Sequence, residues 1–118
     1  MKTTQILICG ICMTLSSFVF ANGCDKSNLV QAGEMTSQGG GATIRFIQNS
    51  MIITQFAGSN SIEQTSEYTA NGNSITYRIV EAMGNGRPTP IKNAGPHTVP
   101  CSLSGGTMRF GSGTWSAW

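Results

Sequence analysis

Two alternating segments around an Asn-Gly pair constrain the fold of this chain most. They lie in residues 67–81, EYTANGNSITYRIVE. Asn71 and Gly72 both tolerate positive φ, and a tight turn built from them matches the right-handed twist of two paired strands. The sequence therefore predicts a β-hairpin with a two-residue loop at Asn71-Gly72.

The register of this hairpin decides which side chains face the core. A two-residue loop places Tyr68 opposite Ile75. On the outer face, Glu63 and Glu67 then flank Arg78 diagonally. A slip by one residue would turn these charges inward, so the charge pattern supports this assignment of faces. The predicted inward row consists of Tyr68, Ile75, Tyr77 and Ile79.

Shorter hairpins are predicted on either side of this one. Segments 42–48 and 51–56 read as strands joined across Gln48-Asn49-Ser50, and segments 101–103 and 107–110 flank Gly105-Gly106. On the first of these strands, one face carries Ala42, Ile44 and Phe46. Residues 22–41 show little periodicity, and they are compatible with one helical turn or a short strand before a glycine-rich connector.

Residues 82–100 form the longest irregular stretch and contain all four prolines of the chain. Proline cannot donate a hydrogen bond to a sheet, so a central strand is not expected here. Long loops on small rigid scaffolds often carry binding residues. This stretch collects Arg87, Lys92 and His97, which we interpret as candidate partner-binding residues. A solvated connector is the alternative.

The first 21 residues have the pattern of a signal peptide. Lys2 supplies a positive start, and residues 6–20 form a mostly apolar run that is too short to cross a bilayer as a helix. Val19-Phe20-Ala21 fits a cleavage site, which puts the mature start at Asn22. The sequence therefore predicts a periplasmic or secreted protein that has no transmembrane segment after cleavage.

The four cysteines divide between the leader and the mature chain. Cys9 and Cys12 would be removed with the signal peptide. Cys24 and Cys101 remain, and in an oxidising compartment they are expected to form a disulfide. Closing so long a loop stabilises a fold by roughly 4 kcal/mol in the chain-entropy model. The alternative for Cys24 is a lipid anchor, which Ala21-Asn22-Gly23 matches poorly because it lacks a large apolar residue.

Cleavage would leave residues 22–118 as a single domain, which is long enough for one core. We expect an all-β fold, a small antiparallel barrel or sandwich of six to eight strands in meander order. The barrel is favoured because the hairpins are short and sequential. The net charge of +2 falls to about +1 without Lys2, which argues against nucleic acid or an anionic membrane as the partner.

The residue pattern does not point to catalysis. His97 is the only histidine and Asp25 the only aspartate, and the chain has no G-x-S-x-G element that would present a nucleophile. Glu63 and Glu67 are explained more simply as partners of Arg78 than as the paired acids of a glycosidase. One histidine and two paired cysteines do not make a metal site. We therefore predict a protein that is not an enzyme and that uses no metal or cofactor.

The middle of the chain resembles the lipocalin-like small β-barrels of exported bacterial proteins. The resemblance covers residues 42–80 and depends on the meandering strands, on Tyr68 ahead of the GNSIT element at 72–76, and on a terminal strand with glycine and tryptophan. Residues 104–110, in which Ser-Gly precedes an aromatic residue, are similar in outline to an element of periplasmic lysozyme inhibitors. Both resemblances imply a β-barrel that binds and does not catalyse.

Taken together, these features predict an exported binding protein of the bacterial envelope or secretome. Its partner would be a small ligand or an envelope protein. The alternative function is inhibition of a cell-wall hydrolase such as lysozyme.

Overall fold

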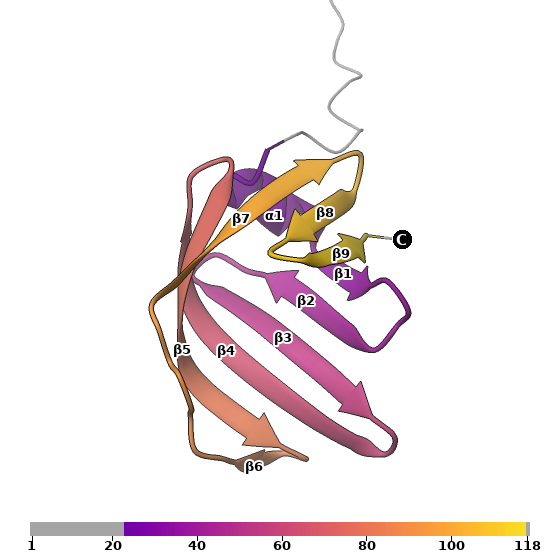
Figure 1. Cartoon of the computed structure of the whole chain (residues 1–118), viewed down its shortest axis with the longest axis vertical. Helices are drawn as coiled ribbons and strands as arrows, with labels where there is room; N and C mark the ends of the chain where they lie inside the picture. The colour runs from indigo at the N-terminus through magenta and orange to yellow at the C-terminus, as the bar shows by residue number, and fades with distance from the viewer. Residues whose placement is uncertain (1–22, 118) are drawn as a thin grey trace, which may run out of the picture.

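The computed structural model describes residues 23–117 of the chain (Figure 1). The predicted signal peptide, residues 1–21, and the predicted mature start at Asn22 lie outside the described residues. The helix α1 spans Lys26–Ala32. The strands are β1 (Glu34–Ser37), β2 (Ala42–Phe46), β3 (Ser50–Ala57), β4 (Asn60–Ala70), β5 (Ser74–Gly84), β6 (Arg87–Pro88), β7 (His97–Ser104), β8 (Thr107–Phe110) and β9 (Gly113–Ser116).

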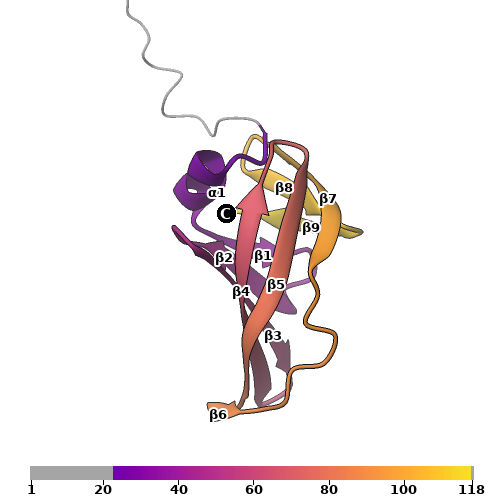
Figure 2. The same ribbon diagram turned by 90° about the vertical axis from the view of Figure 1, so that its left-hand side faces the viewer.

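Eight of these strands form one closed antiparallel barrel in meander order (Figure 1, Figure 2). Neighbours in the barrel follow one another along the chain, and β9 pairs with β1 through Trp115 opposite Ser37 to close the ring. The extra strand, β6, pairs with β5 outside the ring. The predicted all-β antiparallel fold is therefore confirmed, and the barrel, not the sandwich, is the correct alternative.

One end of the barrel is filled by a packed core and is covered by α1 (Figure 2). Its most deeply buried large side chains are Leu29, Met35, Ile44, Phe46, Met51, Ile75 and Met108. Burial alternates along β2 as the sequence predicts, with Ala42, Ile44 and Phe46 facing inward. We call this the closed end of the barrel.

Tyr68 fixes the central hairpin to the closed end. Its ring packs edge-on against Phe46 with 5.3 Å between the ring centroids. Its hydroxyl donates a hydrogen bond to the carbonyl oxygen of Ile47 at 3.0 Å. Because burial removes the solvation that a phenolate would need, the pKa of the Tyr68 hydroxyl is raised above its ordinary value of 10.0.

The predicted hairpin forms β4 and β5, but its register differs from the prediction by two residues. Tyr68 lies opposite Tyr77, and Ile75 lies opposite Ala70. The predicted pairing of Tyr68 with Ile75 is therefore wrong. A shift of two residues leaves each side chain on its predicted face, because side chains alternate with a period of two. Tyr68, Ile75 and Ile79 are accordingly buried, as predicted.

On the outer face, the shift changes which charges meet. Glu67 lies directly opposite Arg78, whereas Glu63 lies opposite Met83, several residues further along β5. The predicted diagonal cluster of Glu63, Arg78 and Glu67 is therefore wrong. A β-bulge, at which Val80 has no opposite residue, displaces the pairing of the second half of this hairpin by one further residue.

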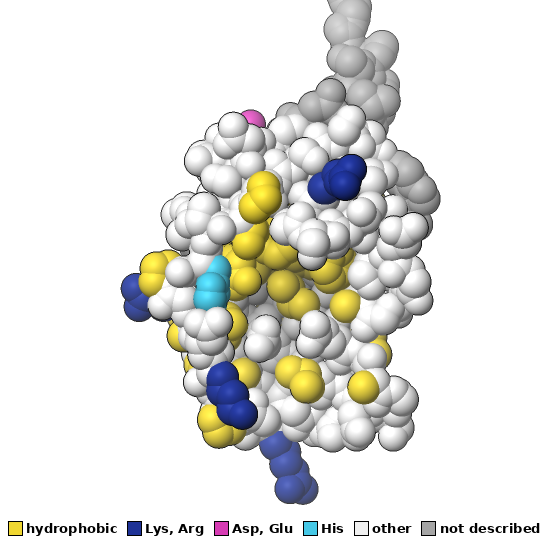
Figure 3. Space-filling model, viewed as in Figure 1, with side chains coloured by type: hydrophobic (Ala, Val, Ile, Leu, Met, Phe, Trp, Pro, Cys, Tyr) yellow, Lys and Arg dark blue, Asp and Glu magenta, His cyan; other side chains and the backbone are white. Residues whose placement is uncertain are grey.

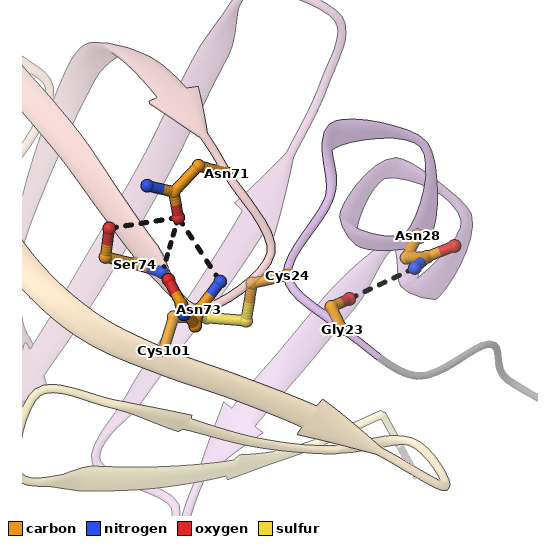
Figure 4. The surroundings of a disulfide bond; sticks show 7 residues. All are labelled: Gly23, Cys24, Asn28, Asn71, Asn73, Ser74 and Cys101. Carbon is orange, nitrogen blue, oxygen red and sulfur yellow. Dashed lines mark hydrogen bonds between the residues drawn. A yellow bond between two sulfur atoms is a disulfide. The ribbon is translucent and has the colours of Figure 1, made fainter.

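Contacts made by the turn account for the shift (Figure 4). Oδ1 of Asn71 accepts hydrogen bonds from the backbone N–H groups of Asn73 and Ser74, at 3.2 and 2.8 Å, and from Oγ of Ser74 at 3.0 Å. Gly72, with a φ of 99°, exchanges two backbone hydrogen bonds with Cys24. These bonds hold Asn71, Gly72 and Asn73 between the strand ends, in place of the predicted two-residue loop.

The predicted disulfide between Cys24 and Cys101 is confirmed, with 6.1 Å between the two Cα atoms (Figure 4). It joins the segment before α1 to β7. The N–H of Cys101 also donates to the carbonyl oxygen of Asn73 at 2.9 Å. The turn of the central hairpin, the start of α1 and β7 are therefore tied together at one point. The sulfur of Cys24, being bonded to Cys101, is not free to carry a lipid at that position.

The proline-rich stretch 82–100 is more regular than predicted. β5 continues to Gly84 and β7 begins at His97, so the prediction of an irregular segment is wrong at both ends. Pro100 is tolerated because β7 pairs with β5 over residues 97–100 and with β8 over residues 101–104, which leaves each half with one unpaired side. The loop that remains, residues 89–96, is tied to β5 by two backbone hydrogen bonds, Thr89 to Ala82 and Ile79 to Ala94.

Candidate functional site at the open end of the barrel

The barrel strands differ in length, and this difference leaves one end open. β4 and β5 have 11 residues each, whereas β1, β8 and β9 have 4 each. At about 3.3 Å per residue, the long strands run roughly 20 Å further than the short ones. Their inward faces are covered beside α1 and lose that cover toward β6 (Figure 1).

On β3 and β4, inward-facing side chains accordingly become more exposed from the closed end to the open end, whereas Ile79 and Ala82 of β5 stay buried. On β3, Met51 is buried, Ile53 is half-buried and Gln55 is exposed. On β4, Ser66 is buried, whereas Ile62 is 49% exposed. Figure 3 shows a hollow on this face with hydrophobic side chains on its floor. We use "the hollow" for the inward surface of Ile53, Gln55, Ile62, Gln64, Tyr77 and Ile79.

An aromatic wall borders the hollow where β5, β7 and β8 meet. The ring of Tyr77 lies 5.3 Å from the imidazole of His97 and 5.9 Å from the ring of Phe110, measured between centroids. Nε2 of His97 is 2.7 Å from the carbonyl oxygen of Asn93. His97, predicted to lie in a loop, is thus the first residue of β7 and sits opposite Tyr77.

Arg87 lies at the rim of the hollow. Ile62, Gly84 and Arg87 are neighbours across β4, β5 and β6, and side chains at paired positions lie on the same face of a sheet. Arg87 therefore shares the inward face with Ile62, and the methyl group of Thr89 lies 3.1 Å from where a Cβ of Gly84 between them would stand. Lys92 is exposed on the loop 89–96. The three predicted partner-binding residues thus lie on β6, on this loop and on β7.

An open pocket of about 320 Å³ lies toward the tip of the β3–β4 hairpin. Its lining includes Ala42, Gln55 and Ile62 from the inward rows and Asn60 from the start of β4. This volume is at the lower end of the range of small-molecule sites, which are mostly apolar with a few polar groups that orient the ligand. Gln55 and Asn60 supply amide groups of that kind.

Trp115 carries a buried polar group that lacks a partner. Its indole Nε1 makes no hydrogen bond within residues 23–117. The atom lies beside Gly113, where an added Cβ would come within 3.2 Å of it, and Gly113 pairs with Phe110 of the aromatic wall. An unpaired buried N–H is unfavourable by about 1 to 3 kcal/mol. Trp115 therefore holds an unpaired donor that is closed off from solvent, on the strand next to Phe110 of the aromatic wall.

These groups are suited to binding a mostly apolar molecule. Across residues 23–117, no group of three or more His, Cys, Asp or Glu side chains is placed to hold a metal ion. The same part of the chain contains no helix with the length and apolar character needed to span a membrane. The hollow offers a ligand apolar, aromatic and amide side chains, and Arg87 adds a cationic group at its rim.

Comparison with protein-family models, with curated proteins and with solved structures gave no match to this chain. The function is therefore inferred from the geometry of the hollow.

Sequence reasoning did not identify the hollow. It predicts that Tyr77 and Ile79 face inward, but alternation alone does not distinguish an inward face that is covered from one that is open. The relevant signal is the length of the strands, because a barrel with long and short strands has to leave part of the long ones uncovered.

Proposed function

We propose that this protein is an exported, non-catalytic binding protein of the bacterial envelope or secretome, and that it holds a small apolar ligand in the hollow. The observation that carries the proposal is the contrast between two isoleucines on neighbouring strands. Ile75 is fully buried at the closed end, while Ile62 is 49% exposed at the open end although both face inward. Covering exposed apolar surface is favourable by about 25 cal/mol per Å², so a ligand seated there gains affinity.

Two further features support the proposal. The Cys24–Cys101 disulfide fits a protein that folds in an oxidising compartment, such as the periplasm or the exterior. The amide groups of Gln55 and Gln64 supply directional contacts for a polar atom of the ligand. Binding of a ligand at the open end of the barrel also agrees with the resemblance of residues 42–80 to lipocalin-like proteins.

The test is a titration with N-phenylnaphthylamine, a neutral apolar dye whose fluorescence rises in an apolar site. We expect saturable binding to the wild-type protein. Replacing Ile53 and Ile62 together by glutamine should weaken binding by about tenfold or more, because each loses an apolar contact worth more than 1 kcal/mol.

Ile47→Gln is the matched control, since Ile47 is 41% exposed but lies at the closed end beside Tyr68. It should leave the dye affinity unchanged. Circular dichroism and urea unfolding establish that all variants are folded. Absence of saturable dye binding to the wild-type protein, or equal affinity in the Ile53/Ile62 variant, would contradict the proposal.

Inhibition of a cell-wall hydrolase is the second candidate function. The segment that resembles lysozyme inhibitors forms the β7–β8 hairpin, and Ser104 and Gly105 at its turn are exposed. An exposed tight turn of this kind could enter the cleft of a partner enzyme. Lysozyme activity measured with micromolar protein tests this function, and unchanged activity would rule it out for that enzyme.

A further inference from the structure

The distribution of charge around the hollow points to the chemical class of its ligand. The five acidic residues of the chain all lie away from the inward face. Asp25 precedes α1 at the closed end, and Glu34 lies opposite Arg45 outside the barrel. The other three belong to exposed positions of the outer rows of β4 and β5: Glu63, Glu67 and Glu81.

Three of the basic residues each face a carboxylate or an aromatic ring within the fold. Arg45 faces Glu34 and Arg78 faces Glu67 across paired strands. The ammonium group of Lys26 lies 5.5 Å from the ring centroid of Tyr68 at the closed end. These three cations therefore have a counterpart within the fold.

Arg87 differs because it shares the inward face with Ile62 at the rim, and none of the carboxylates within residues 23–117 shares that face. Lys92 adds a second exposed cation on the loop that runs from β6 to β7. Figure 3 shows Lys and Arg groups at several places on this face, one of them at the lower left beside the hydrophobic surface, while the acidic colour is seen at the top edge. The hollow is thus an apolar surface with a cationic rim.

From this arrangement we infer that the ligand is an amphipathic anion, with an apolar body in the hollow and an anionic group at Arg87. A cation beside a low-dielectric wall raises the local concentration of anions. A guanidinium also binds a carboxylate through two parallel hydrogen bonds. The inference rests on the proposed function, and it adds the charge of the ligand and the residue that recognises it.

The test compares three amphiphiles with the same ten-carbon chain and different head groups, each below its micelle concentration. Decanoate, decanol and decyltrimethylammonium are used to displace N-phenylnaphthylamine from the full mature protein. We expect decanoate to bind about tenfold more tightly than decanol, since a hydrogen bond to a charged group contributes about that factor. Decyltrimethylammonium should bind least, and added salt should reduce the preference for decanoate.

Variants identify the residue responsible for the preference. Arg87→Gln should bring decanoate to the affinity of decanol, and Lys92→Gln should reduce the preference by a smaller factor. Arg45→Gln removes a cation of the same type from the outer face and should leave the preference intact. If decanol binds as tightly as decanoate, or if Arg87→Gln preserves the preference, the inference is wrong while the proposed function stands. Failure of all three amphiphiles and of the dye to bind would overturn both.

Discussion

The closed and open ends of this barrel share the long strands β3, β4 and β5, yet different interactions act on the two ends. At the closed end a disulfide, a helix, a hydrogen-bonded turn and fully buried side chains meet. At the open end, inward-facing residues such as Ile62 and Gln55 have no strand across from them and stay exposed. The comparison teaches that stability and binding can be separated along one strand. Substitutions at the open end should therefore change recognition with little effect on folding.

Removing the disulfide should have the largest effect on this comparison. The double variant Cys24→Ser with Cys101→Ser should lower the free energy of unfolding by about 4 kcal/mol, because the unfolded chain is no longer constrained by a loop of this length. Urea unfolding followed by circular dichroism measures the loss. The wild-type protein unfolded under reducing conditions is the control and should match the variant. A double variant as stable as the oxidised wild-type protein would show that the closed end does not depend on this bond.

A matched pair of isoleucine substitutions should give the next largest difference. Ile75→Ala empties a fully buried site at the closed end and should destabilise the protein by about 3 kcal/mol. Ile62→Ala removes the same atoms from a half-exposed site at the open end and should change stability by less than about 0.5 kcal/mol. Urea unfolding of the two variants measures both changes in stability. Equal losses at the two sites would show that the open end is packed in solution.

The smallest predicted effect concerns the pH dependence of stability. The folded state holds the phenolic proton of Tyr68 more tightly than the unfolded state, since burial raises its pKa. The resulting stability is complete below the ordinary pKa of 10.0 and declines as the pH rises above it. Tyr68→Phe should lose about 1 kcal/mol at neutral pH with the hydrogen bond to Ile47, and should decline less steeply at alkaline pH.

The measurement is urea unfolding of the wild-type protein and of Tyr68→Phe at neutral pH and at several alkaline pH values, and the difference between the two curves of stability against pH reports on Tyr68. If the free energy of unfolding falls equally steeply with alkaline pH in the wild-type protein and in Tyr68→Phe, then Tyr68 is not the source of the pH dependence.

Local patterns in the sequence were enough to predict the barrel, the disulfide and the inward faces. Alternation depends only on neighbouring residues, so the faces of β2, β4 and β5 follow from it directly. The register of the central hairpin does not, because Gly72 is held by the backbone of Cys24, nearly 50 positions away in the sequence. The two-residue loop at Asn71-Gly72 was a sound local preference that this distant contact overrides.

The candidate site was harder to predict, for a similar reason. Arg87 and Lys92 stand out in the sequence as cations on a long loop, but the apolar surface beside Arg87 comes from β3 and β4 and becomes visible only once the strands are assembled. Trp115 gives no local sign that its indole N–H lacks an acceptor. Properties that depend on how strands of unequal length close into a ring are absent from any short window of sequence.

The Cys24–Cys101 bond also turns residues 24–101 into a covalent ring. The loop 89–96, with Lys92, lies inside this ring, whereas the β8–β9 hairpin lies outside it. A protease that cuts the loop would therefore leave two peptides joined through sulfur, and the cut would be seen on a gel only after reduction. Such a nicked molecule would keep its closed end intact, although the loop 89–96 was cut.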